Sequence, residues 1–133
     1  MRFFKSGLLV VLFCAVIFVS CDDSITNTQI DQIVIPSSDI SYEKYIQPVF
    51  TVKCNNSACH DNNSAAGGLV LTNWVSATRD PGVIFPGEPN SSRLVWSIEG
   101  TSTNPMPPVG YPPLTKNQIN GIKTWIREGA KNN

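Results

Sequence analysis

Apolar and polar positions divide the chain into three parts. Gly7 to Val19 is an unbroken run of small and apolar residues. Residues 22–38 are rich in Asp, Ser, Thr, Asn and Gln, with only a thin alternation of isoleucines. From residue 41 apolar side chains recur at helical spacing, separated by loops rich in proline and glycine. The pattern predicts a leader over residues 1–20, a tether over 21–40 and one helical domain over 41–131.

Two helices are predicted in the first part of that domain. Ser41 is a plausible N-cap for a helix whose apolar stripe is Tyr42, Tyr45, Ile46, Val49 and Phe50. Pro48 falls inside this stripe, so the helix is either kinked there or begins again with Pro48 in its first turn. A second, short helix is expected to run through Ile98, with Asn90 or Ser91 as its N-cap.

The last helix has the clearest signals. Thr115 and Gln118 have the spacing of a capping box, and an apolar stripe follows at Ile119, Ile122, Trp125 and Ile126. Gly121, in the middle of this helix, either marks a close approach of another segment or is simply tolerated there. Together the patterns predict an all-α fold of three to four short helices with long loops.

The leader has the features of an export signal. Arg2 and Lys5 precede the apolar run, which is too short for a membrane-spanning helix of about 20 residues. The sequence around Cys21 resembles the lipidation site of bacterial lipoproteins, although a plain anchor helix with an incidental cysteine is the alternative. We therefore expect an exported protein whose lipid anchor holds it to a membrane, facing the periplasm or the cell surface.

Charge narrows the range of partners. Ten basic and ten acidic residues balance over the whole chain, and loss of the leader would leave a slightly acidic protein. Such a protein has no basic surface of the kind that binds nucleic acid, so none is expected as a partner.

The cysteines point to one site. Cys14 lies in the leader and Cys21 would carry the lipid, which leaves Cys54 and Cys59 in the domain. His60 follows Cys59 directly, and a cysteine pair followed by histidine is the attachment signature of c-type haem, with the imidazole as proximal iron ligand. Four residues separate these cysteines where two are usual. A Cys54–Cys59 disulfide beside an ordinary histidine is the alternative.

A second iron ligand is available further along the chain. Met106 is the only methionine besides Met1, and it lies in the sequence Asn104-Pro105-Met106-Pro107-Pro108. Prolines restrict the backbone on both sides, so this loop could hold a thioether sulfur against an iron. We therefore expect His60 and Met106 as the metal ligands if a haem is present.

With these features the chain resembles the small single-haem cytochrome c domains of exported bacterial proteins, including those named for planctomycetes. The stretches that carry this resemblance come in the expected order: Ile46-Gln47-Pro48-Val49-Phe50, Cys59-His60, Gly67-Gly68-Leu69-Val70-Leu71, Pro86-Gly87-Glu88-Pro89, Met106-Pro107-Pro108, and Leu114 to Ala130. The resemblance implies one covalently bound haem c and a carrier of single electrons between redox proteins. Two protein ligands leave no open position on the iron, and no second histidine is present to act as an acid or base, so we expect neither enzymatic activity nor a small-molecule substrate.

Three further points stay open at this stage. Arg93 is a candidate partner for a haem propionate, because a partly buried carboxylate needs a cation or a hydrogen bond. Cys54, Cys59, His60 and Met106 also form a soft ligand set that suits Cu(I). A disulfide-stapled lipoprotein module with an interaction role is the remaining alternative.

Overall fold

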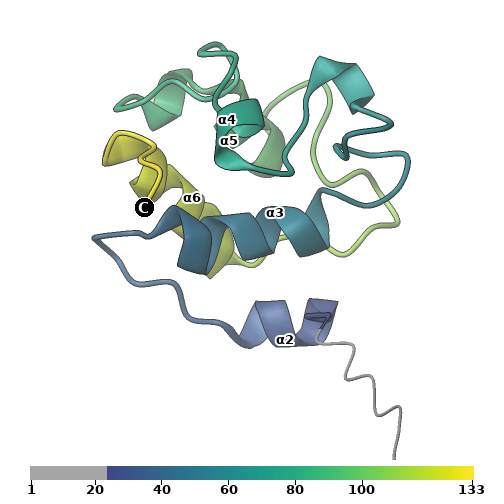
Figure 1. Ribbon diagram of the computed structural model, residues 1–133, viewed down its shortest axis with the longest axis horizontal. Coiled ribbons are helices and arrows are strands. Elements are labelled where there is room, and N and C mark those ends of the chain that lie inside the picture. The colour runs from purple at the N-terminus through teal and green to yellow at the C-terminus, as the bar shows by residue number, and fades with distance from the viewer. Residues whose placement is uncertain (1–23) are drawn as a thin grey trace, which may run out of the picture.

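The computed structural model describes residues 24–133, and the predicted leader and Cys21 lie outside them. Within the described residues the chain is helical and contains no strand, which confirms the all-α prediction (Figure 1). The α-helices are α2 (Asn27–Gln32), α3 (Gln47–Lys53), α4 (Trp74–Ala77), α5 (Arg93–Ile98) and α6 (Lys116–Arg127). Three shorter helical turns complete the set: η1 (Tyr42–Ile46), η2 (Ala66–Gly68) and η3 (Pro89–Ser91).

The helix predicted after Ser41 consists of two pieces. Ser41 caps η1, a π-helical turn, by accepting a hydrogen bond from the backbone N–H of Lys44. The α-helix α3 then starts at Gln47, with Pro48 in its first turn. Proline is tolerated there because the first N–H groups of a helix have no partner within it. The helix therefore begins again at Gln47, with Pro48 in its first turn.

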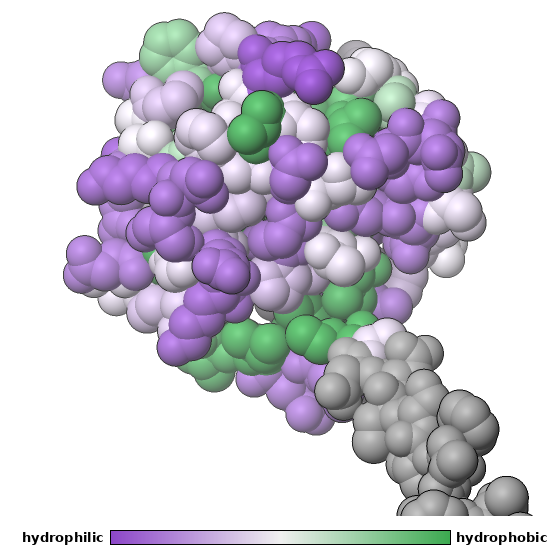
Figure 2. Space-filling model, in the orientation of Figure 1, coloured by the Kyte–Doolittle hydropathy of each residue, from purple (hydrophilic) through white to green (hydrophobic). Residues whose placement is uncertain are grey.

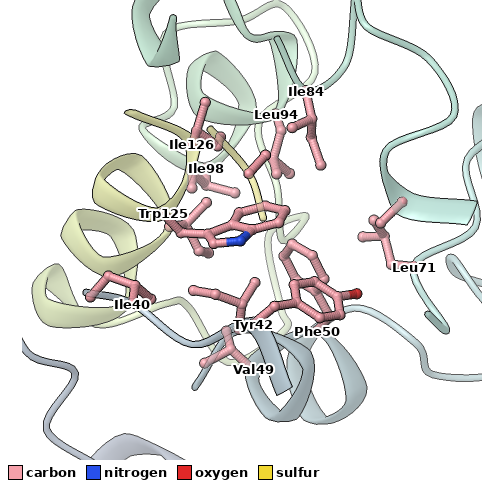
Figure 3. Packing of buried hydrophobic residues seen from close by; sticks show 14 of the residues in the cluster. Ile40, Tyr42, Val49, Phe50, Leu71, Ile84, Leu94, Ile98, Trp125 and Ile126 are labelled. Carbon is pink, nitrogen blue, oxygen red and sulfur yellow. The ribbon is translucent and has the colours of Figure 1, made fainter. Parts of the chain in front are cut away.

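The core forms where α3 and α6 meet (Figure 3). Trp125 of α6 is fully buried, and its ring centroid lies 5.2 Å from that of Tyr42 and 6.4 Å from that of Phe50. Leu94 and Ile98 from α5 close the other side of this cluster. The predicted capping box of Thr115 and Gln118 is present at the start of α6. The packing of Trp125 against Tyr42 and Phe50 holds the first and last helices of the predicted domain together.

The segment predicted as a tether packs onto the domain, so that prediction is wrong for residues 27–40. Ile30, Ile35 and Ile40 are each no more than 3% exposed and belong to the core. Helix α2 lies below α3 in Figure 1 and packs against it. The isoleucine alternation is therefore a buried face, because all three isoleucines belong to the core cluster that includes residues of α3 and α6.

The part of the fold with α4 and α5 lies on the opposite side of α3 from α2 (Figure 1).

The structure corrects the predicted N-cap of α5: Asn90 and Ser91 lie in η3, and Ser92 takes the N-cap position. The Ser92 hydroxyl is buried and bridges the turn, since it accepts from Phe85 N at 2.9 Å and donates to Glu88 O at 3.0 Å.

The outer surface is mixed in character. Polar side chains cover most of the face drawn in Figure 2, with apolar side chains scattered among them. None of the helices formed by residues 24–133 is long and apolar enough to cross a membrane.

Candidate functional site

Helix α3 delivers the cysteine motif. Val49 and Phe50 anchor α3 in the core, and the helix ends at Lys53 with Cys54 as its C-cap. The backbone N–H groups of Cys54 and Asn55 both donate to the Phe50 carbonyl at 2.9 Å. These two hydrogen bonds fix the backbone of Cys54 at the end of α3.

The six residues after Cys54 fold back on it. The N–H of Cys59 donates to Asn56 O at 2.9 Å, and the N–H of His60 donates to Cys54 O at 3.1 Å. Ala58 adopts a left-handed conformation with φ of 70°, which allows this reversal. The four-residue spacing between the cysteines thus forms a closed loop that returns His60 to the end of α3.

Cys54 and Cys59 are free, partly buried thiols that are not joined in a disulfide. The pKa of Cys54 is raised from its ordinary 9.0 to about 12, mainly by burial and in smaller part by the neighbouring Cys59, while Lys53 acts in the opposite direction. The hydrogen bond from His60 N–H to Cys54 O brings the two ends of the cysteine loop together. The pair is available for bonding to a third group.

His60 is oriented by a backbone contact. Its Nδ1 lies 3.2 Å from the carbonyl oxygen of Leu69. A carbonyl oxygen can only accept, so Nδ1 carries the proton and the neutral ring keeps its lone pair on Nε2. Histidines that bind metals are held in this way by a second contact from the other ring nitrogen. Nε2 is therefore the nitrogen prepared for a metal.

The loop of residues 61–71 supplies that carbonyl. The N–H of Ala66 donates to Cys59 O at 2.9 Å, and the N–H of Leu71 donates to His60 O at 2.9 Å. Gly67 and Gly68 have φ of 64° and 76°, a region that glycine adopts without steric cost. No local pattern in the sequence predicts the contact between His60 and Leu69.

One polar atom in the motif stays unsatisfied. Asn55 donates from Nδ2 to Leu71 O at 2.9 Å, but its buried Oδ1 has no hydrogen-bond partner within residues 24–133. Buried polar atoms without partners are rare and often mark places where another group binds. In the sequence Asn55 stands between the two cysteines.

Met106 comes from a different segment. Its backbone N–H donates to Ser97 O at 2.8 Å, which fixes the loop to α5, and its side chain is partly buried. Ligation of iron by this thioether stays a prediction.

Arg93 already has an ion-pair and a hydrogen-bond partner. Its Nη2 lies 2.7 Å from Asp80 Oδ2 and its Nε donates to Gly82 O at 3.0 Å, on an exposed part of the surface. These contacts clamp the turn at residues 80–82. Contact of Arg93 with a propionate stays a prediction, and it would have to compete with Asp80.

Cys54, Cys59 and His60 have the residue types and order of a c-type haem attachment signature. Within residues 24–133 no three His, Cys, Asp or Glu side chains form a group that could hold a metal ion. A zinc site is built from such a group, whereas Cu(I) also accepts methionine sulfur. Two free thiols and one oriented imidazole are, in contrast, the donor set that attaches a haem.

Comparison with known families agrees with this chemistry. Residues 57–110 match the sequence model of the family described as Planctomycete cytochrome C. This match confirms the predicted resemblance over a stretch that includes Cys59, His60 and Met106. Cys54, α2 and α6 lie outside the matched residues. No curated protein and no solved structure matches the chain.

Proposed function

We propose that this protein is an exported, lipid-anchored c-type cytochrome with one haem, which carries single electrons between redox proteins. The observation that carries the proposal is the orientation of His60. Its Nδ1–H is held by Leu69 O beside two free thiols, inside a stretch that matches a cytochrome c family. When bound, the haem supplies the one-electron Fe(II)/Fe(III) couple.

Each residue of the motif has a defined role. Cys54 and Cys59 would hold the haem, each through a thioether formed by addition of its S–H across one vinyl double bond, which would leave no free cysteine in the domain. His60 offers Nε2 as the proximal ligand, because Nδ1 is committed to Leu69 O. Because this hydrogen bond already fixes the imidazole ring, ligation of the iron would cost little further side-chain entropy.

Met106 is assigned as the second axial ligand. Its sulfur favours the ferrous state and so raises the reduction potential. Since His60 and Met106 would then fill both axial positions, no open position remains for a substrate. The chain also has no second histidine to act as an acid or base. An electron carrier fits this composition better than an enzyme.

Covalent attachment can be tested directly. We expect protein matured with a haem ligation apparatus to show a Soret band that survives acid–acetone extraction. The Cys54→Ala/Cys59→Ala variant should lose the band, while Ser57→Ala, inside the same loop, should keep it. A wild-type protein without this band would overturn the proposal.

The axial ligand has its own test. Met106→Ala should open a coordination position, lower the reduction potential and allow the ferrous protein to bind CO. An unchanged potential and spectrum would show that Met106 is not a ligand, while leaving the covalent haem in place.

The anchor can be tested without reference to the haem. Cys21→Ser should abolish labelling by a radioactive fatty acid and release the protein from the membrane fraction. Cys14→Ser is the matched control, because that cysteine lies within the leader, and it should be labelled like wild type. Equal labelling of both variants would refute lipidation at Cys21.

A further inference from the structure

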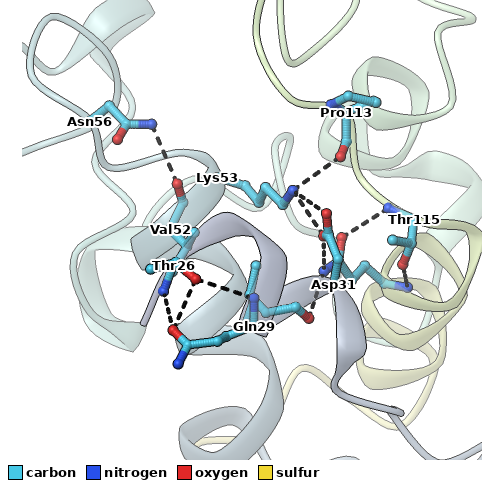
Figure 4. A network of polar contacts seen from close by, with 10 residues as sticks. Thr26, Gln29, Asp31, Val52, Lys53, Asn56, Pro113 and Thr115 are labelled. Carbon is cyan, nitrogen blue, oxygen red and sulfur yellow. Dashed lines mark hydrogen bonds and ion pairs between the residues drawn. The ribbon is translucent and has the colours of Figure 1, made fainter. Parts of the chain in front are cut away.

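Lys53 is the most unusual charged residue in the described chain. Its side chain is 0% exposed, although it is the last residue of α3 and directly precedes Cys54. The ammonium lies 2.9 Å from Asp31 Oδ1 and 3.1 Å from Asp31 Oδ2, and it donates to the carbonyl of Pro113 at 3.3 Å (Figure 4). Burying a charge is unfavourable unless such partners compensate it.

These contacts join segments that are far apart in the sequence. Asp31 belongs to α2, and its Oδ1 also accepts a hydrogen bond from Gln118 Nε2 at 3.1 Å. Gln118 is fully buried in the first turn of α6, and its second amide hydrogen bond goes to Ile30 O at 3.2 Å. The network thus connects α2, the end of α3, the start of α6 and the segment before it (Figure 4).

The Pro113 contact reaches the loop that carries Met106. That loop is fixed at one end by Met106 N–H, which donates to Ser97 O, and near its other end by the bond from Lys53 to Pro113. Between these points Val109 is 100% exposed and Tyr111 is 54% exposed, so the middle of the loop gains little from packing. The position of the loop depends mainly on its two ends.

We propose that Lys53 is a positioning residue that sets the Met106 loop relative to Cys54 and His60. This one residue links the two segments. Its backbone leads into Cys54, and its ammonium donates a hydrogen bond to Pro113 O. Asp31 acts through Lys53, because it supplies the charge that keeps the ammonium buried. Residues before the family-matched stretch thereby act on the sixth iron ligand. This inference rests on the proposed ligation by His60 and Met106.

The experiment is an imidazole titration of the ferric, haem-loaded, full-length protein, because imidazole competes with the methionine sulfur for the iron. Lys53→Met should lower the apparent dissociation constant for imidazole by about tenfold, the usual effect of losing a contact that supports a metal ligand. Lys123→Met is the matched control, since it removes an ion pair between Lys123 of α6 and Glu99, the C-cap of α5, and leaves the Pro113 contact in place. It should leave the constant unchanged.

A second variant separates positioning from stability. Asp31→Leu/Lys53→Met replaces the ion pair by apolar side chains, an exchange that often preserves stability. It should still bind imidazole about tenfold more tightly than wild type, since the Pro113 contact is absent. If either folded Lys53 variant binds imidazole like wild type while Met106→Ala binds it more tightly, the positioning role is overturned. If Met106→Ala also binds like wild type, the proposed Met106 ligation fails instead.

Discussion

The packing of residues 27–40 on the domain can be tested at Gly121, in the middle of α6. A Cβ added there would lie 2.7 Å from Ile35 Cγ2, 2.9 Å from Ile35 Cδ1 and 3.2 Å from Ile35 Cβ. Ile35 cannot easily withdraw, because its N–H donates to Asn117 Oδ1 at 2.8 Å and its carbonyl accepts from Asn117 Nδ2 at 3.0 Å. Gly121→Ala should therefore force a strained contact.

Two opposing free energies set the size of the effect. Alanine is favoured over glycine inside a helix by about 1 kcal/mol. Overpacking a buried position costs about 1–3 kcal/mol, and the value here should be near 2 because three atoms of one pinned residue are involved. We expect Gly121→Ala to lower the free energy of unfolding by about 1 kcal/mol.

The assay is urea unfolding of the haem-loaded protein followed by far-ultraviolet circular dichroism, arranged as a double-mutant cycle with Ile35→Ala. Ile35→Ala alone should cost about 2–5 kcal/mol. In that background Gly121→Ala should stabilise by about 1 kcal/mol, which gives a coupling energy of about 2 kcal/mol. Asn120→Ala, an exposed neighbour on α6, should stabilise slightly and show no coupling.

One outcome would refute this reasoning. If Gly121→Ala stabilises the protein by about 1 kcal/mol in the presence of Ile35, the helix behaves as though its glycine were uncovered. Ile35 would then not pack on α6 in solution, and residues 21–40 would be the tether that the sequence alone suggested.

Three further predictions concern stability. Asp31→Asn should lower the free energy of unfolding by about 3 kcal/mol, because it leaves the fully buried ammonium of Lys53 without its charged partner. Lys53→Met should lower it by much less, because it leaves no fully buried charge. Equal losses in urea unfolding would contradict this. Burial raises the pKa of Tyr42 above its ordinary 10.0, so the unfolded state releases this proton first and stability falls as pH rises above 10. Tyr42→Phe should make that fall shallower when urea midpoints are compared across this pH range, and an identical pH dependence would count against the buried phenol. Thr115→Ala should cost about 1 kcal/mol through loss of the capping box, while Thr115→Ser should keep most of it; equal midpoints for both would show that the cap does not matter.

The prediction from sequence was most accurate where a local rule acts alone. Ser41 as a cap and the Thr115–Gln118 capping box depend on residues three positions apart, so the chain needs no distant partner to form them. It was less accurate at Ser92, whose hydroxyl bridges Phe85 and Glu88, while the predicted caps Asn90 and Ser91 lie in η3. A local sequence pattern does not reveal which of three polar residues the preceding turn will bury.

By itself the sequence determined the helical class and the Cys54, Cys59, His60 motif, because helical periodicity and the chemistry of adjacent side chains are properties of neighbouring residues. Only the tertiary structure decided that Leu69 O holds His60 Nδ1, that Ile35 packs against Gly121, and that one buried ammonium joins Asp31 to Pro113. Each of these contacts depends on how segments far apart in the chain come together. An alternation of isoleucines looks the same in a solvated connector and in a buried face until the surface that covers it is known.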